Sequence, residues 1–151
     1  LKNTSIKKSI ERIIVNYKPT ADLRDIKINL INKVNKDVNL KLDNTLFEIA
    51  IRNLLDNAIK YSPTENNVDV ILEIHEDEYL IKFINTSLSK LNFDLKKIMK
   101  RFSRGNKNEK VIGTGLGLSI VKEATNSLKG DLKISKQKGN VFCAILLLPL
   151  S

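Results

Sequence analysis

Segments in which apolar and polar residues alternate come in adjacent pairs along this chain, and segments of helical periodicity separate the pairs. Alternation with a period of two predicts strands with one buried face, whereas apolar residues three or four positions apart predict amphipathic helices. Strand pairs with helices between them favour an α+β two-layer sandwich over a doubly wound parallel sheet. We therefore expect a mixed, mostly antiparallel sheet that helices cover on one face.

Helices and strands are predicted along the whole chain. A first helix is expected from Ile6 to Tyr17 and stops before Pro19. A second begins at a cap of Asn44 or Thr45 and ends near Tyr61. Further helices are expected at Phe93–Phe102 and Leu116–Leu128, and strands at Lys27–Ile31, Val38–Leu42, Val68–His75, Tyr79–Asn85, Asp131–Ser135 and Val141–Leu148.

The length of 151 residues predicts one domain over residues 1–151. The longest apolar run, Val141–Leu150, is too short to cross a bilayer, and the charged N-terminal segment does not resemble a secretory signal. A single cysteine, Cys143, excludes a disulfide framework and fits a reducing, cytoplasmic location, with the residue itself in the core. Because the chain begins with Leu1 and not Met, we expect a piece of a longer protein, and the sequence leaves open whether that parent is anchored in a membrane.

The net charge of +9 permits binding to nucleic acid through phosphate attraction. Most lysines are nevertheless spread along the chain, and the sequence has neither an aromatic RNA-binding motif nor a zinc-finger spacing. One basic cluster contains Lys96, Lys97, Lys100, Arg101, Arg104, Lys107 and Lys110. We interpret this cluster as a solvated or anion-attracting segment, and we expect no nucleic-acid partner.

The second predicted helix carries two asparagines one turn apart. Asn53 and Asn57 lie on one side of it, and Lys60 and Tyr61 follow one turn later. Asparagine is a poor helix former, because its side chain competes with the backbone for hydrogen bonds. The pair is either the polar edge of an amphipathic helix, or a set of amide oxygens and one ammonium suited to Mg²⁺ and the phosphates it bridges. The apolar face of this helix is expected to contain Leu46, Ile49, Ala50, Leu54 and Ala58.

All six glycines follow residue 104, and three of them alternate directly before a predicted helix. The motif is Gly113-Thr114-Gly115-Leu116-Gly117-Leu118. Backbone N–H groups at such a helix N-terminus can approach an anion closely. The spacing is neither that of the dinucleotide-binding glycine fingerprint nor that of the Walker P-loop. Taken alone, the motif fits either a phosphate cradle or a hinge that packs a helix closely.

Together these motifs indicate a function more specifically than either motif does alone. The order Asn-x-x-x-Asn-Ala-x-Lys-Tyr, then Arg-Phe-x-Arg-Gly, then Gly-Thr-Gly-Leu-Gly-Leu resembles the catalytic and ATP-binding domain of sensor histidine kinases. That domain belongs to the superfamily shared with gyrase, Hsp90 and MutL, and the resemblance runs from Ile6 to Leu150. It implies a Bergerat-type ATP-binding fold, the cofactors ATP and Mg²⁺, and a phosphoryl donor of a two-component phosphorelay in signal transduction.

The resemblance implies roles for the asparagine helix. Asn57 matches the residue that coordinates Mg²⁺, and Asn53 matches the polar residue one turn before it. Lys60 matches a phosphate-contacting lysine, and Tyr61 the aromatic residue beside the nucleotide. Gyrase-type members have a water-activating glutamate at the position of Asn53, whose amide cannot act as a general base. This difference favours transfer to a nucleophilic histidine over hydrolysis.

The resemblance also implies a lid over the nucleotide at Ser103–Ile112. Phe102 matches the anchor of this lid, and Arg104 matches a residue that reaches the phosphates. We expect high mobility over Arg104–Gly113. The residues expected over the triphosphate are Gly113, Thr114, Gly115, Leu116, Gly117 and Leu118. Catalytic roles are thereby expected for Asn53, Lys60 and Arg104.

One part of the chain departs from the family pattern. After the strand that ends near Phe83, family members carry Asp-x-Gly-x-Gly, whose aspartate accepts a hydrogen bond from the adenine amino group. Here Asn85 takes the place of the aspartate, and the glycines are missing. The neutral amide can still pair with adenine, so we expect ATP binding that is weakened but retained. The alternative is a pseudokinase that no longer binds nucleotide and serves as a binding module.

The phosphate acceptor is expected elsewhere in the parent protein. The single histidine, His75, lies in a polar turn between two strands, and nothing near it builds a dimerisation helix. We therefore expect the partner to be a histidine-containing dimerisation domain of the same parent chain, and a response regulator to act with the full kinase. The isolated domain is expected to be monomeric and to phosphorylate itself little. A stand-alone serine kinase of the anti-sigma type remains the alternative enzyme.

Overall fold

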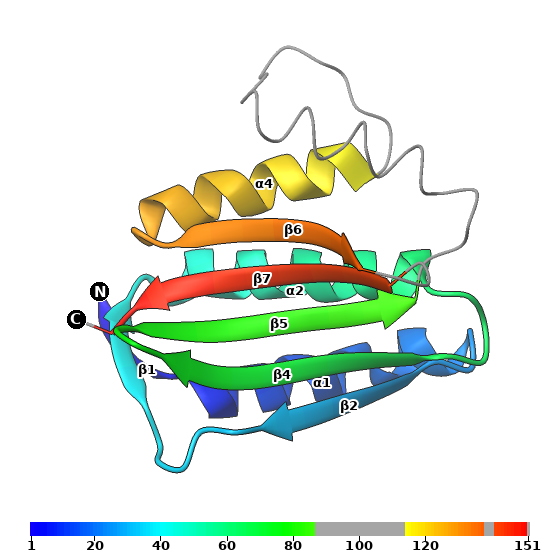
Figure 1. Ribbon diagram of the computed structural model, residues 1–151, viewed down its shortest axis with the longest axis horizontal. Coiled ribbons are helices and arrows are strands. Elements are labelled where there is room, and N and C mark those ends of the chain that lie inside the picture. Colours follow the sequence, from blue (N-terminus) through cyan, green and yellow to red (C-terminus); the bar gives the residue numbers. More distant parts are fainter. Residues whose placement is uncertain (87–113, 138–140, 151) are drawn as a thin grey trace.

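A five-stranded sheet forms one layer of the molecule, as seen in a computed structural model that describes residues 1–86, 114–137 and 141–150 (Figure 1). The strands lie in the order β2-β4-β5-β7-β6. β2 pairs parallel with β4, and each of the other neighbours pairs antiparallel. The predicted mixed, mostly antiparallel sheet is thus confirmed. The strands are β2 Lys27–Asn32, β4 Asn67–His75, β5 Glu78–Thr86, β6 Asp131–Gln137 and β7 Val141–Pro149.

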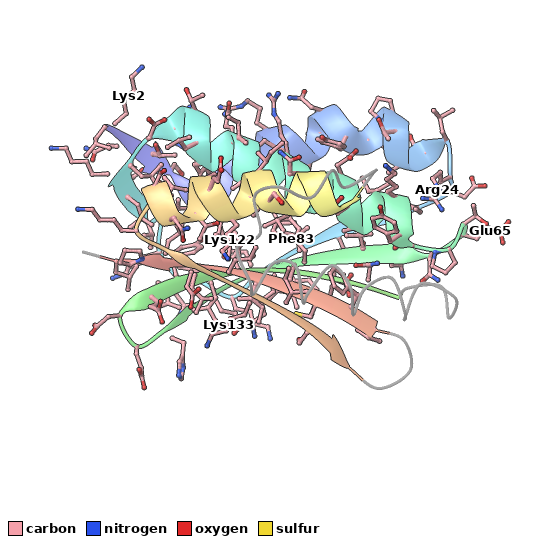
Figure 2. All side chains as sticks on the ribbon, turned by 90° about the horizontal axis from the view of Figure 1, so that it is seen from above. Lys2, Arg24, Glu65, Phe83, Lys122 and Lys133 are labelled. Carbon is pink, nitrogen blue, oxygen red and sulfur yellow. The ribbon has the colours of Figure 1, made fainter. Side chains whose placement is uncertain are left out.

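Helices of the described residues cover one face of this sheet (Figure 2). They are α1 Ile6–Asp22, α2 Asn44–Tyr61 and α4 Thr114–Ser127. A small second sheet pairs β1 Lys2–Ser5 antiparallel with β3 Asn39–Leu42. Strand β3 is predicted from the sequence, whereas β1 is not. The α+β two-layer sandwich is confirmed.

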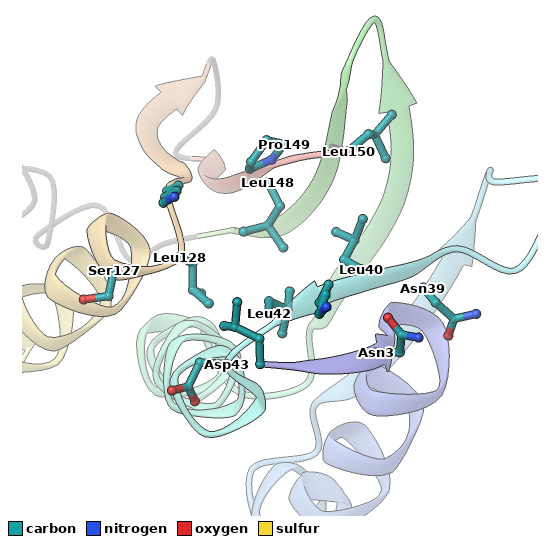
Figure 3. A pocket seen from close by; sticks show the side chains of 13 residues that line it. Asn3, Asn39, Leu40, Leu42, Asp43, Ser127, Leu128, Leu148, Pro149 and Leu150 are labelled. Atoms are coloured by element: carbon teal, nitrogen blue, oxygen red, sulfur yellow. The ribbon is translucent and has the colours of Figure 1, made fainter.

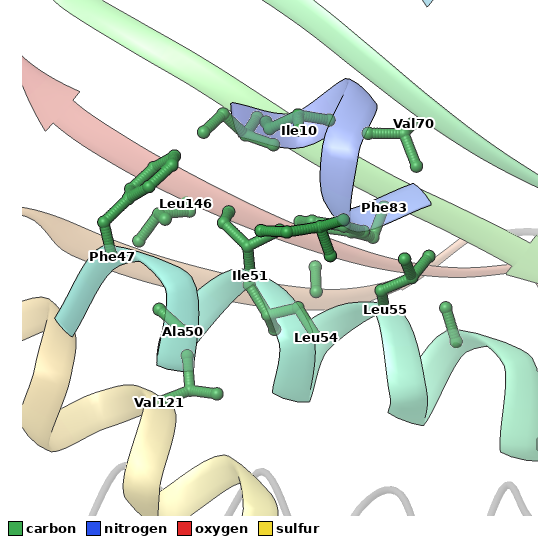
Figure 4. Packing of buried hydrophobic residues seen from close by; sticks show 14 of the residues in the cluster. Ile10, Phe47, Ala50, Ile51, Leu54, Leu55, Val70, Phe83, Val121 and Leu146 are labelled. Atoms are coloured by element: carbon green, nitrogen blue, oxygen red, sulfur yellow. The ribbon is translucent and has the colours of Figure 1, made fainter. Parts of the chain in front are cut away.

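The central helix α2 packs against the sheet and against both other helices. On the sheet side, Phe83 of β5 lies among the α2 side chains of Ile51 and Leu55, and Val121 of α4 approaches Ala50 (Figure 4). Because α2 has neighbours on several sides, its buried surface is wider than one amphipathic stripe. Two predicted core residues, Leu46 and Ile49, are only half-buried. The buried residues of α2 are Phe47, Ala50, Ile51, Leu54, Leu55, Asn57, Ala58 and Ile59.

The N-terminus of α2 is capped one residue earlier than predicted. The carboxylate of Asp43, not Asn44 or Thr45, accepts a hydrogen bond from the backbone N–H of Leu46 at 3.1 Å. This contact satisfies one of the N–H groups that the first turn leaves without a helical partner. The negative charge also lies at the positive end of the helix dipole. Asp43 therefore fixes where α2 begins.

The sequence predicts that the first helix stops before Pro19. In the structure, α1 continues through Pro19 to Asp22. A proline inside a helix removes one N–H donor, and here the carbonyl of Val15 loses its partner. Val15 is 68% exposed, so water can hydrate that carbonyl. The cost of the proline is therefore small enough for the packed helix to absorb it.

Leu72 allows a test of the core. It lies on the helix-facing side of β4 and is 0% exposed. Leu72→Ala is expected to lower the free energy of unfolding by about 2–5 kcal/mol, because it leaves a cavity under the helices. The matched control on the same strand is Ile74→Ala, since Ile74 is 37% exposed. Urea unfolding of both variants measures the difference, and equal losses would contradict the burial of Leu72 in the core.

Candidate functional site

The C-terminal half of α2 presents the four predicted side chains at different depths. Asn57 is 7% exposed, Asn53 and Tyr61 are half-buried, and Lys60 is exposed. The amide nitrogen of Asn53 donates one hydrogen bond, to the carbonyl of Ile49 at 2.7 Å, so its carbonyl oxygen and its second N–H are the groups it can offer a ligand. One end of a single helix thus carries two amides, a phenol and an ammonium.

Buried polar atoms without a hydrogen-bond partner gather near this helix end. Within the described residues they are Nδ2 of Asn57, Oγ of Ser62, and both Nδ2 and Oδ1 of Asn85. Folded proteins pair nearly all buried polar groups, because each unpaired group costs about 1–3 kcal/mol. Asn57 and Asn85 are predicted from the sequence as site residues, but Ser62 is not, because a serine before Pro63 is typical of an ordinary turn. Unpaired groups at one place indicate a site for a polar ligand.

Asn85 lies at the C-terminal end of β5, on the face of the sheet that the helices cover. It is 2% exposed, and its cross-strand partners Val68 and Phe142 are also buried. Helix α2 and strand β5 run in the same direction (Figure 1). The end of α2 that carries Asn57 and Ser62 therefore lies at the same end of the molecule as Asn85.

Helix α4 begins two residues earlier than predicted, at Thr114. Gly115 and Gly117 consequently lie within its first turns rather than before it. α4 runs antiparallel to α2, and Val121 approaches Ala50 near the middle of both helices (Figures 1 and 4). The start of α4 therefore lies at the end of α2 that carries Asn57. The first N–H groups of a helix have no helical partner, so they are available to an anion at this position.

A guanidinium that the sequence analysis missed holds the end of α2. Nη1 of Arg24 donates to the carbonyls of Ile59 and Lys60 at 2.6 and 2.7 Å, and Nη2 donates to the carbonyl of Ser62 at 2.6 Å. The last carbonyls of a helix lack helical partners, and a cation there also complements the helix dipole. The carbonyl of Arg24 accepts from the N–H of Glu65 at 3.1 Å, and both residues lie at one end of the molecule (Figure 2). These contacts fix the backbone that carries Lys60.

Some predicted features lie outside the described residues. They are the helix Phe93–Phe102 with Phe102, the lid Ser103–Ile112 with Arg104, and Gly113. The mobility predicted for Arg104–Gly113 stays a prediction. For Thr114–Leu118 the structure describes the backbone as part of α4.

The histidine and the cysteine do not belong to this site: His75 lies at the β4–β5 turn, and Cys143 lies on the other face of the sheet. His75 is exposed at the β4–β5 turn, as predicted, with its Nε2 3.8 Å from Glu76. Cys143 is 2% exposed, and burial raises the pKa of its thiol. Its neighbours Phe142 and Ala144 belong to the main hydrophobic core, so Cys143 lies on the opposite face of β7. The cysteine is buried, but outside the core beneath the helices.

A pocket of about 450 Å³ lies at the opposite end of the molecule, where both termini are found (Figures 1 and 3). Leucines from β3, from the segment after α4 and from the end of β7 line much of it, among them Leu42, Leu128 and Leu148. It contains none of the predicted site residues. Polar side chains such as Asn39, Asp43 and Lys129 complete its lining.

The family model of the histidine kinase-, DNA gyrase B- and HSP90-like ATPases matches residues 42–151, and the chain belongs to this family. Within that family, the chain corresponds to the catalytic ATP-binding domain of sensor histidine kinases. The matched range begins just before α2 and includes Asn85 and α4.

Curated relatives and solved structures agree with this membership. The chain is 28% identical over 129 residues to the sensor protein CreC of Escherichia coli strain K12, covering 85% of this chain and 27% of the relative. It is 29% identical over 123 residues to the sensor histidine kinase WalK of Bacillus subtilis strain 168, covering 78% and 20%. The chain thus spans only about a quarter or less of the curated relatives' length.

The fold is that of solved histidine kinase domains. The catalytic domain of histidine kinase ThkA in a nucleotide-free form aligns with a TM-score of 0.78 at 16% identity, covering 98% of this chain and 95% of that chain. Full-length ShkA in complex with AMPPNP aligns with a TM-score of 0.76 at 15% identity, covering 99% of this chain and 31% of that one. At such identities the likeness establishes the fold.

Asn57 allows a test of the site in the absence of ligand. Asn57→Leu is expected to raise the free energy of unfolding by about 1–3 kcal/mol, because it removes a buried unpaired amide. The control is Asn53→Leu on the same helix, where the amide is half-buried and hydrogen-bonded. Both changes gain the same helix propensity, so their difference isolates the buried group. Chemical denaturation measures it, and a larger gain at position 53 would argue against an open polar site.

Arg24 allows a test of the contacts that hold the end of α2. Arg24→Ala is expected to lower the free energy of unfolding by about 1–3 kcal/mol, because three helix-end carbonyls lose a charged donor. The control, Arg12→Ala, removes an exposed ion pair with Glu48 and should cost less than about 1 kcal/mol. Thermal or urea unfolding compares the two. Equal effects would show that the Arg24 contacts add nothing to stability.

Proposed function

We propose that residues 1–151 are the phosphoryl-donor domain of a two-component sensor histidine kinase, and that they bind ATP with Mg²⁺ and transfer its γ-phosphate to a histidine on a separate dimerisation domain. Family membership supports the binding of ATP and the kinase class. The single observation that carries the site is the group of unpaired buried atoms at Asn57, Ser62 and Asn85. A polar ligand at that end would supply the missing hydrogen bonds.

The residues present suit Mg²⁺ with a nucleotide. The buried amide nitrogen of Asn57 has no hydrogen-bond partner. A half-turn of the amide group exchanges its two ends and places the carbonyl oxygen at the position of the nitrogen. Amide and phosphate oxygens are ligands that Mg²⁺ accepts in a shell that retains water. Asn57 would therefore hold the ion together with the phosphates. When bound, the ion would neutralise charge on the triphosphate.

The chain's own groups bind and orient the phosphates. Lys60 is exposed at the end of α2, where its ammonium can reach a phosphate, and the proposed cradle at Thr114–Leu118 adds the first N–H groups of α4, which have no partner within the helix. Asn53 would orient a ligand through its carbonyl oxygen. It has no basic lone pair to activate water, so the site favours an acceptor that is itself nucleophilic, such as an imidazole. We also propose Arg104 and Gly113 as phosphate contacts and Tyr61 as a neighbour of the nucleotide.

Asn85 is proposed to contact the base, through a neutral amide where family members carry a carboxylate. Hydrogen bonds to a neutral acceptor are weaker than those to a charged one. We therefore expect ATP binding that is retained but weaker than in relatives with the carboxylate. The structure has the buried unpaired amide at this position that such a contact requires.

Calorimetric titration with Mg–ATP tests nucleotide binding. Binding is expected for the wild-type chain, and Asn57→Ala should weaken it by about tenfold or more, because the ion and the phosphates lose a ligand. The matched control is Asn126→Ala, since Asn126 is exposed on α4 and outside the site. Neither heat nor a thermal shift with the wild-type chain would indicate the nucleotide-blind pseudokinase instead.

Phosphoryl transfer needs a second experiment with the separately produced dimerisation domain of the same parent protein. Radiolabel from the γ-phosphate of ATP is expected on that domain, in an acid-labile and alkali-stable form typical of phosphohistidine. An acid-stable label on a hydroxyl would support the anti-sigma type of serine kinase. Binding without any label would reduce the role to that of a binding module.

The cellular location, oligomeric state and partner of this domain are also proposals. No helix in the described part of the chain is both long and apolar enough to span a bilayer. We propose that the domain acts in the cytoplasm, is a monomer in isolation, and works with a response regulator through the full kinase. The relatives support a two-component role, since they are sensor proteins and sensor histidine kinases.

A further inference from the structure

Both hydrogen-bonding atoms of the Asn85 side chain are buried without a partner. The residue is 2% exposed, and no described residue donates to its Oδ1 or accepts from its Nδ2. A half-turn about the Cβ–Cγ bond exchanges the oxygen and the nitrogen of an amide. Among the described residues, nothing therefore fixes which of the two atoms faces the ligand.

The described surroundings of Asn85 are apolar. Its cross-strand partners Val68 and Phe142 are 0% and 5% exposed, and Phe83, the preceding residue on the same face of β5, is 1% exposed. An ionised group is costly in such surroundings unless it is paired. The part of a ligand that meets Asn85 is therefore neutral, which fits the base of a nucleotide and not its phosphates.

We propose that Asn85 lets this site accept 6-oxopurine nucleotides as well as ATP, an inference that rests on the proposed function. In one orientation, the amide accepts a hydrogen bond from the 6-amino group of adenine and donates one to N1. In the other, it donates to O6 of a 6-oxopurine and accepts from N1–H. Each base can thus form two hydrogen bonds with the amide, and neither leaves it unpaired.

A carboxylate at this position would select between the bases. It only accepts hydrogen bonds, so at the 6-position it pairs with the amino group of adenine but faces the lone pairs of O6 in a 6-oxopurine, where N1–H is the one donor left to it. Sites that hydrogen-bond a particular substrate group reject analogues that lack the group, because buried polar atoms are then left unpaired. The neutral amide removes this discrimination and weakens the contact to adenine at the same time.

The test compares Mg–ATP with Mg–ITP by calorimetric titration of the full 151-residue chain and of Asn85→Asp. ITP carries the 6-oxo and N1–H groups without the 2-amino group of guanine, so the two bases have nearly the same size. For the wild-type chain, the two dissociation constants are expected to lie within about tenfold of each other. Asn85→Asp should shift the ratio toward ATP by about tenfold or more.

The possible failures are distinguishable. ATP binding with ITP weaker by more than about tenfold in the wild-type chain would overturn this inference and leave the proposed function standing. Binding of neither nucleotide would overturn both. An unchanged ratio in folded Asn85→Asp would overturn the assignment of base selection to this residue.

A second variant keeps the test decisive if the buried carboxylate of Asn85→Asp prevents folding. Asn85→Leu removes both hydrogen bonds and also an unpaired buried amide, so it is expected to fold. It should lower the affinities for ATP and ITP by the same factor. A loss confined to ATP would contradict the inference. Circular dichroism and thermal unfolding establish that each variant is folded before titration.

Discussion

The packing of α2 against the sheet and against α1 and α4 sets the position of the polar groups that α2 contributes to the candidate site. Its apolar residues, such as Ile51 and Leu55, contact the sheet and leave the helix little freedom to rotate or slide. Asn57 lies on the same helix, and its depth below the surface follows from that packing. The hydrophobic core thereby holds an amide at 7% exposure without giving its nitrogen a partner. A polar side chain in a less constrained helix would turn toward water.

Under the proposed function, this arrangement lowers the stability of the ligand-free fold in favour of ligand binding. Asn57, Ser62 and Asn85 contribute polar atoms that are buried and unpaired in the described structure, and each atom reduces the stability of the ligand-free fold. Functional sites often retain such locally unfavourable groups, because a ligand compensates for them when it binds. The rest of the fold has ordinary apolar packing, and it can tolerate this cost.

Much of the fold follows from the sequence, because it depends on local patterns. Alternating residues locate the strands of the large sheet, and helical spacing locates α2 to within a residue. The predictions fail where contacts with distant parts of the chain determine whether an element forms or where it ends. Strand β1 forms because β3 offers it an edge, and α1 passes Pro19 because the tertiary fold supports it.

The candidate site also combines residues that local sequence patterns predict with residues that only distant contacts place there. Asn53, Asn57 and Lys60 could be selected from their spacing on one helix, and Asn85 from the family resemblance, in which it takes the place of an aspartate. Arg24 could not, because its contacts join residues 35 to 38 positions apart, and Ser62 could not, because nothing local shows that its hydroxyl is buried.

The Arg24 contacts also have a consequence for how the molecule opens. They link the corner between α1 and β2 to the last turn of α2, and the N–H of Glu65 completes the link. Segments joined in this way separate together rather than one at a time. Backbone amides at the corner and at the helix end should therefore exchange with deuterium as one cooperative unit. A disturbance at the corner would reach the backbone of Lys60 directly through the side chain of Arg24.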